Sequence, residues 1–483
     1  MKVLENLQPA KVFKYFEEMS MIPRGSGNEK GISDYLVNFA KERNLEVIQD
    51  EALNVIIKKK ASKGYENAPG VIIQGHMDMV CEKTKESTHD FMKDPLQLRV
   101  EGDNVYATNT TLGADNGIAV AYALAILDDD SISHPALEVL VTTDEETGMG
   151  GAMAFDGSLI NGKYLLNIDS EEEGKLLLSC AGGLRTKVVL DTEFENNTEK
   201  ELLRIEVKGL KGGHSGMEII KQRGNSNKLM GRVLAKISES VTFNIVEING
   251  GSKNNAIPRE AECIIAVESD NIKEVTEIVT KMGDNFKNEL LSVDENVKVV
   301  CEHLNNRSER IMSEDTTKKI IALLNLIPSG VDTMSMDIED LVQSSTNLGV
   351  VKTNKNNVEF DSATRSSVGT LKEDLVSRIK IAAQLTGASV ETSGEYPEWQ
   401  YEKNSKLREL CKEVYKRLSG QDAEIIALHA GLECGLFKEK LHDVDMISFG
   451  PNLYDVHTPN EHMSIKSVQN VWKFLLEILK EIK

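Results

Sequence analysis

The chain has 483 residues, of which 40% are hydrophobic and 28% charged, which is typical of a soluble globular protein with about two or three domains. Its 56 Lys and Arg residues against 77 Asp and Glu residues give a formal net charge of −21. A surface that acidic repels phosphate backbones and anionic lipids, so we expect neither nucleic acid nor a membrane as a partner. Metal cations, in contrast, suit such a surface.

The cysteines and the hydrophobic segments indicate a reduced, cytoplasmic protein. The six cysteines form no C-x-x-C pair and are too few in so long a chain for a disulfide framework, so we expect them to be buried or inert. Residues 1–20 lack the apolar core of a signal peptide. The longest apolar stretch, 117–127, is far shorter than the ~20 residues that a membrane span needs.

The first third of the chain alternates helical and extended patterns. An amphipathic helix is predicted over 28–43, and a second helix over 116–127 with Asp115 placed to cap it. Short apolar strands are predicted at 71–74, 137–142 and 164–168. Strands that alternate with helices favour an α/β layer with a mostly parallel sheet.

The pattern changes near residues 181–183, and the next region begins at about residue 185. In that region we expect strands such as 202–207 and 263–267. Helices are expected there at 225–240, 271–291, 314–326 and 370–386. This region lacks a comparable group of histidines and carboxylates at strand ends, so it differs in kind from the first third.

The first pattern returns from about residue 397. Its expected elements are a helix at 404–418, a buried run at 424–428, a strand at 446–449 and a final helix at 466–482. We therefore interpret 1–184 and 397–483 as one α/β domain, interrupted by an inserted domain over 185–396. The insertion is expected to have two αβ halves, at 185–305 and 306–395.

Polar side chains follow the predicted strands at the points where these strands end. They are His76 and Asp78, Glu145 and Glu146, Asp169, and His457 in the loop after the last strand. Because the carboxyl ends of parallel strands gather at one edge of a sheet, we expect these groups to converge there. Carboxylates and imidazoles so close together call for cations, and mixed nitrogen and oxygen ligands suit zinc, cobalt or manganese better than calcium.

Each of these residues also has an ordinary interpretation. A single histidine after a strand is commonly a satisfied polar residue, adjacent glutamates are commonly solvated, and Asp115 alone is typical of a helix cap. His76 and Asp78 are more informative, because residues two apart on a strand share a side and the carboxylate can orient the imidazole. It is the combination that favours a metal site.

Seven motifs occur in order along nearly the whole chain. They are VIIQGHMDMV at 71–80, TLGADNG at 111–117, TDEETG at 143–148, NIDSEEEG at 167–174, GGHSG at 212–216, NAIPRE at 255–260 and HAGLECG at 429–435. Together they resemble the motifs of bacterial aminoacyl-histidine dipeptidases, also called Xaa-His or cytosol non-specific dipeptidases. These enzymes belong to the two-metal exopeptidase superfamily that includes carnosinases and aminoacylases.

The resemblance implies a fold and a set of metal ligands. The fold would be a mostly parallel-sheet α/β catalytic domain with a dinuclear metal site, interrupted by an inserted α+β lid domain. His76 and Asp169 would bind one divalent ion, most simply zinc, and Glu146 and His457 would bind the other. Asp115 would bridge the two ions, which explains a carboxylate at a position where a helix cap would also do.

The resemblance also implies catalytic and substrate-binding residues. Asp78 would orient His76, and Glu145 would act as the general base and then as the general acid. The residues that would contact the carbonyl and the terminal carboxylate of a substrate lie in the lid: His214, Asn255 and Arg365. Glu433 has two interpretations, a place near the substrate amine and a structural role.

The expected function is the hydrolysis of dipeptides of broad specificity, with a preference for Xaa-His left open. A related amide hydrolase, such as an aminoacylase or a tripeptidase, is the alternative within enzymes. A metal-binding scaffold without turnover is the alternative outside them, and the intact base Glu145 argues against it. Small dipeptides are the expected partners of a cytoplasmic monomer or homodimer.

Overall fold

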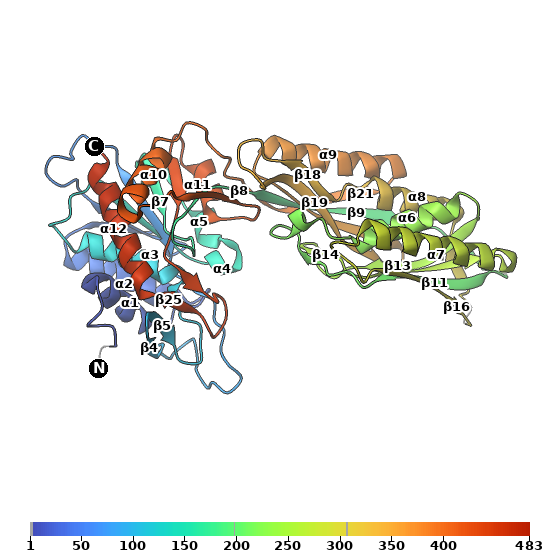
Figure 1. The fold of residues 1–483 in the computed structure, drawn as a ribbon, viewed down its shortest axis with the longest axis horizontal. Coiled ribbons are helices and arrows are strands. Elements are labelled where there is room, and N and C mark those ends of the chain that lie inside the picture. Colours follow the sequence, from blue (N-terminus) through green and yellow to red (C-terminus); the bar gives the residue numbers. More distant parts are fainter. Residues whose placement is uncertain (1–2, 198, 306–307) are drawn as a thin grey trace. The chain divides into compact units, whose positions relative to one another are not determined.

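Two compact units make up the fold in the computed structural model, which describes residues 3–197, 199–305 and 308–483 (Figure 1). The first unit consists of Met1–Ser179, Tyr401–Ala427 and Leu432–Lys483. The second unit consists of Cys180–Gln400 and Leu428–Gly431. The chain thus passes between the units after residues 179 and 400, where the sequence suggested 184 and 396, and the short return of 428–431 has no counterpart in the expected division.

An eight-stranded sheet forms the centre of the first unit, in the order β1-β2-β6-β3-β7-β23-β8-β22. Its four middle strands run parallel: β6 (Leu137–Thr142), β3 (Val71–His76), β7 (Tyr164–Asn167) and β23 (Asp445–Ser448). The antiparallel pairings add β1 (Glu46–Gln49), β2 (Val55–Lys59) and β8 (Lys175–Cys180), and β22 (Glu424–Leu428) lies at the edge. The expected sheet of mostly parallel strands is confirmed in its centre, whereas β22 is half-exposed rather than buried.

The first unit also contains helices, several of which contact the strands of this sheet. They are α1 (Ala10–Ser20), α2 (Lys30–Glu42), α3 (Ala114–Leu127), α4 (Glu145–Gly148), α5 (Gly150–Ala154), α10 (Lys406–Ser419), α11 (Glu433–Lys440) and α12 (Ile465–Glu481). The apolar stretch seen in the sequence lies in α3, which is buried on all sides from Asn116 onward and contacts β3 and α1. Among the described residues, no helix is long and apolar enough to cross a bilayer.

A second sheet of the first unit positions the loop that carries His457. It has four strands in the order β24-β25-β5-β4, which are Leu453–Tyr454, His462–Ser464, Asn104–Ala107 and Leu98–Glu101. The loop between β24 and β25 contains His457, and β25 pairs with β5, where His462 lies opposite Tyr106. The sequence did not predict this sheet, because its strands are only two to four residues long.

The second unit is built on one antiparallel sheet in the order β16-β11-β15-β13-β19-β20-β9-β21, with β18 beside β19. Its strands are β9 (Gly182–Asp191), β11 (Glu201–Lys208), β13 (Phe243–Gly250), β15 (Ala261–Val267), β16 (Lys298–Leu304), β18 (Gly330–Met334), β19 (Val342–Thr353), β20 (Asn357–Ser366) and β21 (Ser389–Tyr396). Two small pairs complete the strands: β10 (Phe194–Asn196) with β17 (Arg310–Met312), and β12 (Gly213–His214) with β14 (Ala256–Ile257).

Four helices pack along this sheet (Figure 1), and their order in space differs from their order in the chain: the first contacts the second and the third, and the third contacts the fourth. They are α6 (Ser226–Ser238), α7 (Ile272–Glu289), α8 (Glu314–Leu326) and α9 (Gly369–Thr386), and their apolar sides share one core with the sheet. This arrangement confirms the α+β class. The two expected halves, however, share one sheet, because β9 from the first half lies between β20 and β21 of the second.

Candidate active site

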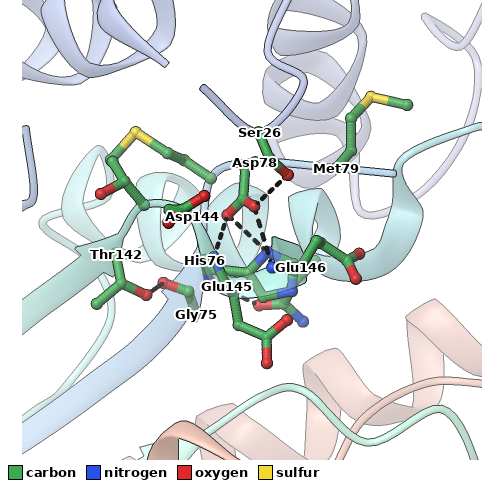
Figure 2. Close-up of polar contacts among 12 residues, drawn as sticks. Ser26, Gly75, His76, Asp78, Met79, Thr142, Asp144, Glu145 and Glu146 are labelled. Atoms are coloured by element: carbon green, nitrogen blue, oxygen red, sulfur yellow. Dashed lines mark hydrogen bonds and ion pairs between the residues drawn. The ribbon is translucent and has the colours of Figure 1, made fainter. Parts of the chain in front are cut away.

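The carboxyl ends of the parallel strands carry the predicted site residues. His76 is the last residue of β3, Glu145 and Glu146 begin α4 just beyond β6, and Asp169 follows β7. Parallel pairing of β6, β3 and β7 brings these ends to the same edge of the sheet. Figure 2 shows His76, Asp78, Glu145 and Glu146 side by side at this edge.

His76 is surrounded by carboxylates. Its Nδ1 lies 3.3 Å from Asp78 Oδ1, and its Nε2 lies 3.3 Å from Asp115 Oδ1 and 3.5 Å from Asp169 Oδ1. The side chain is buried. Burial alone would lower the pKa of His76, but Asp115, Asp169 and Asp78 outweigh it and raise the pKa well above its usual range. The pocket around His76 therefore favours positive charge.

Asp115 lies between two imidazoles. Its Oδ1 faces His76, and its Oδ2 lies 3.2 Å from His457 Nε2, which also lies 3.1 Å from Glu146 Oε2. Asp115 and Glu146 raise the pKa of His457 to about 11. Asp115 has the extended φ and ψ of −79° and 106° that a cap residue adopts, but its carboxylate faces the two imidazoles instead of the helix amides.

The donor set fits divalent cations. Atoms of His76, Asp115 and Glu146 that can act as ligands all lie within 4.8 Å of one another. Asp169 and His457 each face a member of this trio at 3.5 Å or less. Imidazole nitrogens and carboxylate oxygens that face one another, buried or half-buried, match the ligands that zinc, cobalt and manganese prefer.

Asp78 ties His76 to the start of α4. Its carboxylate accepts hydrogen bonds from Ser26 Oγ at 2.8 Å and from the amides of Glu145 and Glu146 at 3.1 and 3.2 Å (Figure 2). Burial would raise the pKa of Asp78, but His76 and these donors lower it to about 2. Asp78 is therefore an ionised group that can orient the imidazole beside it.

Glu145 and Glu146 are adjacent in sequence but differ in surroundings. Figure 2 shows their carboxyl groups pointing in different directions, and that of Glu146 faces His457. Burial is the main cause that raises the pKa of Glu145 to about 9, and the negative charge of Asp169, Glu433 and Glu146 adds to it. Glu145 is thus a carboxyl group with a raised pKa, next to the donor set that fits divalent cations.

Glu433 lies in a buried polar network in the first unit. Its Oε2 accepts hydrogen bonds from Gln74 Nε2 at 2.7 Å and from Thr142 Oγ1 at 2.9 Å, and Gln74 Oε1 in turn accepts one from Asn167 at 2.5 Å. Burial raises the pKa of Glu433 to about 7. These contacts join β3, β6 and β7 through side chains. They fit a structural role, which is one of the two interpretations that the sequence left open for Glu433.

Arg24 and Asn116, which no sequence pattern singled out as site residues, help to hold the backbone of this site. Arg24 is buried and donates to the carbonyls of Met77 and Asp78 at 2.9 and 3.2 Å. Asn116 accepts from the amide of His76 at 3.2 Å and donates to the carbonyl of Ile168 at 2.6 Å. Asn116 stands in one of the seven motifs and could have been noticed there, whereas a lone arginine near the start of the chain gives no signal.

The three predicted residues of the inserted domain lie close together in the second unit. His214 on β12 is opposite Ala256 on β14, next to the exposed Asn255. A Cβ built on Gly216 would lie 3.1 Å from His214 Cε1 and 3.3 Å from Arg365 Nε. The imidazole and the guanidinium therefore converge over this glycine.

His214 is held as a neutral hydrogen-bond donor. Its Nδ1 accepts from the amides of Gly216 and Met217 at 3.3 and 3.1 Å. Burial and the charge of Arg365 lower the pKa of His214. A neutral imidazole that accepts through Nδ1 carries its proton on Nε2, so His214 can donate from that nitrogen.

Arg365 is positioned by an aromatic ring. Its Nη1 donates to Tyr396 Oη at 2.5 Å. The Tyr396 ring fits between two glycines, because a Cβ on Gly183 or Gly431 would come within 2.4 or 2.6 Å of it. A fixed guanidinium beside a neutral imidazole is a suitable receptor for a carboxylate.

Comparisons with known proteins identify the family of the chain. Residues 72–481 match the sequence pattern of the peptidase family M20/M25/M40. The chain is 40% identical over 486 aligned residues to the cytosol non-specific dipeptidase of Escherichia coli (strain K12), covering 100% of this chain and 99% of that protein. Its structure matches the aminoacylhistidine dipeptidase of Vibrio alginolyticus with a TM-score of 0.96 and 37% identity, covering 99% and 98% of the two chains.

A more distant structure shares only the fold. The aminopeptidase PepT of Bacillus cereus ATCC 10987 matches with a TM-score of 0.58 and 15% identity, covering 99% of each chain. The match to the family pattern and the full-length relatives confirm the resemblance that the seven motifs indicate. The chain therefore belongs to the peptidase family M20/M25/M40.

Proposed function

We propose that this protein is a metallo-dipeptidase that hydrolyses dipeptides with two divalent metal ions. The observation that carries the proposal is the placement of Asp115, with one carboxylate oxygen toward His76 and the other toward His457. A carboxylate shared in this way suits two cations, and adjacent carboxylates supply the remaining ligands. Membership of a peptidase family and full-length relatives named as dipeptidases support the substrate class.

The proposed ligand sets follow the contacts in the first unit. His76 and Asp169 hold one ion, Glu146 and His457 hold the other, and Asp115 bridges them. Zinc is the proposed metal, with cobalt and manganese as alternatives that suit the same donors. Such ions, when bound, lower the pKa of the attacking water and polarise the scissile carbonyl.

Glu145 is the proposed general base and acid. Burial, with the negative charge of neighbouring acids, raises the pKa of Glu145 to about 9 in the metal-free protein. Bound cations would offset that negative charge, so that the carboxylate ionises. Glu145 then takes a proton from the attacking water and delivers it to the leaving amine. Asp78 contributes indirectly, because its carboxylate holds both the His76 imidazole and the Glu145 amide.

The second unit supplies the proposed substrate contacts. His214 donates from Nε2 to the oxygen of the tetrahedral intermediate, where negative charge develops. Arg365 binds the terminal carboxylate, and Asn255 contacts the carbonyl region. A carboxylate receptor so close to an oxyanion donor favours short substrates, which accounts for dipeptides rather than longer peptides. These substrate-binding residues can come from the same chain or from a second copy of it. The prediction that the protein is a monomer or a homodimer therefore stays open to both.

The proposed specificity is broad, with Xaa-His dipeptides as one candidate class. An aminoacylase, a tripeptidase and a scaffold without turnover are the competing functions. The protein should be stripped of metal, reloaded with zinc, cobalt or manganese, and assayed with Gly-His, β-Ala-His, a tripeptide and an N-acetyl amino acid. We expect metal-dependent turnover of the dipeptides above the other substrates.

Other results of this assay would select a competing function. Preferred cleavage of the N-acetyl amino acid would indicate an aminoacylase, and preferred cleavage of the tripeptide a tripeptidase. Tight metal binding without turnover of any substrate would indicate a metal-binding scaffold that is not an enzyme. A cytosolic location is also proposed, after the name of the Escherichia coli relative, and cell fractionation would test it.

A further inference from the structure

One buried carboxylate accepts four consecutive backbone amides beside the proposed metal ligands. Glu461 Oε2 accepts from the amides of Leu112 and Gly113 at 2.7 and 2.9 Å. Its Oε1 accepts from the amides of Ala114 and Asp115 at 2.8 and 3.3 Å. The Glu461 side chain is only 2% exposed. These hydrogen bonds are therefore shielded from bulk water, and a hydrogen bond is electrostatically stronger in the protein interior than in water.

The same backbone segment is held from the carbonyl side by Arg24. The Arg24 guanidinium donates to the carbonyl of Gly113 as well as to those of Met77 and Asp78. Gly113 has a φ of +65°, and a Cβ on it would lie 2.6 Å from Arg24 Nη2. Only glycine fits both the left-handed conformation and this close approach. The segment 112–115 is thus hydrogen-bonded to two buried side chains, Glu461 through its amides and Arg24 through the carbonyl of Gly113.

These hydrogen bonds from Glu461 and Arg24 hold the backbone that carries Asp115. Asp115 does not follow the helical path of α3, and its carboxylate faces His76 and His457 instead of the helix amides. The direction of the side chain is therefore set by the backbone at 112–115, whose four amides end on Glu461. A small rotation of this segment would move both oxygens of Asp115 at once.

We propose that Glu461 is a positioning residue of the metal centre: by accepting the four amides of 112–115, its carboxylate aims Asp115 so that one oxygen serves each cation. The proposal rests on the proposed function only in that two cations share Asp115. Glu461 would thereby affect the metal affinity of both sites without being a ligand itself.

The test compares Glu461→Gln with a matched control, Glu138→Gln. Glu138 is also a buried glutamate of the first unit, and its Oε2 accepts the amides of Asn161 and Gly162, both at 2.8 Å. It lies near the start of β6, opposite Ile72, whereas His76 is opposite Thr142 at the end of that strand. Both variants remove one buried charge that holds a loop, but only one of these loops carries Asp115.

Glutamine at 461 keeps one acceptor oxygen and turns an NH2 group toward amides that need an acceptor, so the segment at 112–115 must shift. We expect the zinc dissociation constants of both sites, measured by chelator competition, to rise ~10–100-fold, the usual range for residues that orient ligands. The visible spectrum of the cobalt-loaded variant at saturating metal should also change. Glu138→Gln should leave the constants and the cobalt spectrum as in the unaltered protein.

The outcomes separate this proposal from the proposed function. If the unaltered protein binds two ions and Glu461→Gln binds them with the same constants and cobalt spectrum, the positioning role is overturned while the metal centre stands. If the unaltered protein binds no metal, the proposed function itself fails. Thermal unfolding of the metal-free variants reports any purely structural loss, which would lower the melting temperature without changing the affinity of the folded protein.

A measurement on the unaltered protein covers the case in which Glu461→Gln does not fold. Amide hydrogen exchange of the metal-free protein should be slow at 112–115, because four buried amides with a carboxylate acceptor are protected. Fast exchange at these amides in the folded, metal-free protein would contradict the proposal.

Discussion

His76 Nε2 and Asp115 Oδ1 lie 3.3 Å apart, and the second oxygen of the same carboxylate faces another imidazole. His76 is buried, and the neighbouring acids raise its pKa well above the usual range. The pair thus lies in a buried place that favours positive charge, and divalent ions supply that charge more strongly than protons do.

Metal removal should abolish dipeptide hydrolysis and lower the melting temperature. Ions that bind only the folded state stabilise it by mass action, and without them the carboxylates near His76 repel one another. Dialysis against a chelator, with metal content verified by elemental analysis, would be followed by an activity assay and by differential scanning calorimetry. Full activity in verified metal-free protein would refute the two-metal proposal.

Glu145→Gln and Glu146→Gln should have different effects although the residues are adjacent. Loss of a general base typically lowers kcat by ~10²–10⁴-fold, so Glu145→Gln should reduce turnover that much while both metals stay bound. Glu146→Gln should instead weaken one metal site, because its carboxylate faces His457. Each variant serves as the control for the other, and equal metal loss in both would mean that base and ligand are wrongly assigned.

His214→Ala should lower kcat by ~10²–10³-fold, the usual effect of losing one donor to an oxyanion, and should leave metal content unchanged. His303→Ala is the matched control, because His303 lies in the same unit on β16 and pairs with Glu201 at an exposed position. The measurement is steady-state kinetics on a dipeptide at saturating metal. A kcat close to that of the unaltered protein would leave His214 with only its part in the β12–β14 turn.

His429 should make the stability of the protein depend on acidity. Burial, together with Arg365 and His214, lowers the pKa of His429 to about 3, and its Nε2 lies 2.7 Å from Ser345 Oγ. In the unfolded chain its pKa is about 6.5, so the unfolded state takes up the proton first as the pH falls. The folded state then loses up to about 1.4 kcal/mol per pH unit, from the unfolded pKa down to the folded one.

His429→Gln should therefore flatten the fall in melting temperature between about pH 6.5 and pH 4, because the substitution removes the group whose pKa shifts. Metal-free protein should be used, so that loss of ions at low pH does not contribute. His303→Gln, at an exposed histidine, should keep the slope of the unaltered protein. If His429→Gln shows that same slope, the pKa of His429 is not lowered in the folded state.

Local sequence patterns predicted several elements and the polar residues at the ends of the parallel strands. Leu137–Thr142 and Glu314–Leu326 have the predicted bounds, because hydrophobic periodicity and capping residues act over a few neighbouring positions. The polar residues after parallel strands also came together as expected, since strand direction alone brings their ends to one edge. A local pattern was incomplete at one position. The place of Asp115 before a helix suggested a capping side chain, but its carboxylate faces two histidines.

Which distant groups hold the site depends on tertiary packing. Glu461 binds the amide of Asp115 from 346 positions away, and Arg24 reaches Gly113 across 89 positions. The shared sheet of the second unit, with β9 between β20 and β21, also depends on pairings that no local pattern encodes. Periodicity reports the environment of a segment but not its partner, because the choice of partner follows from how all segments pack and satisfy their buried polar groups together.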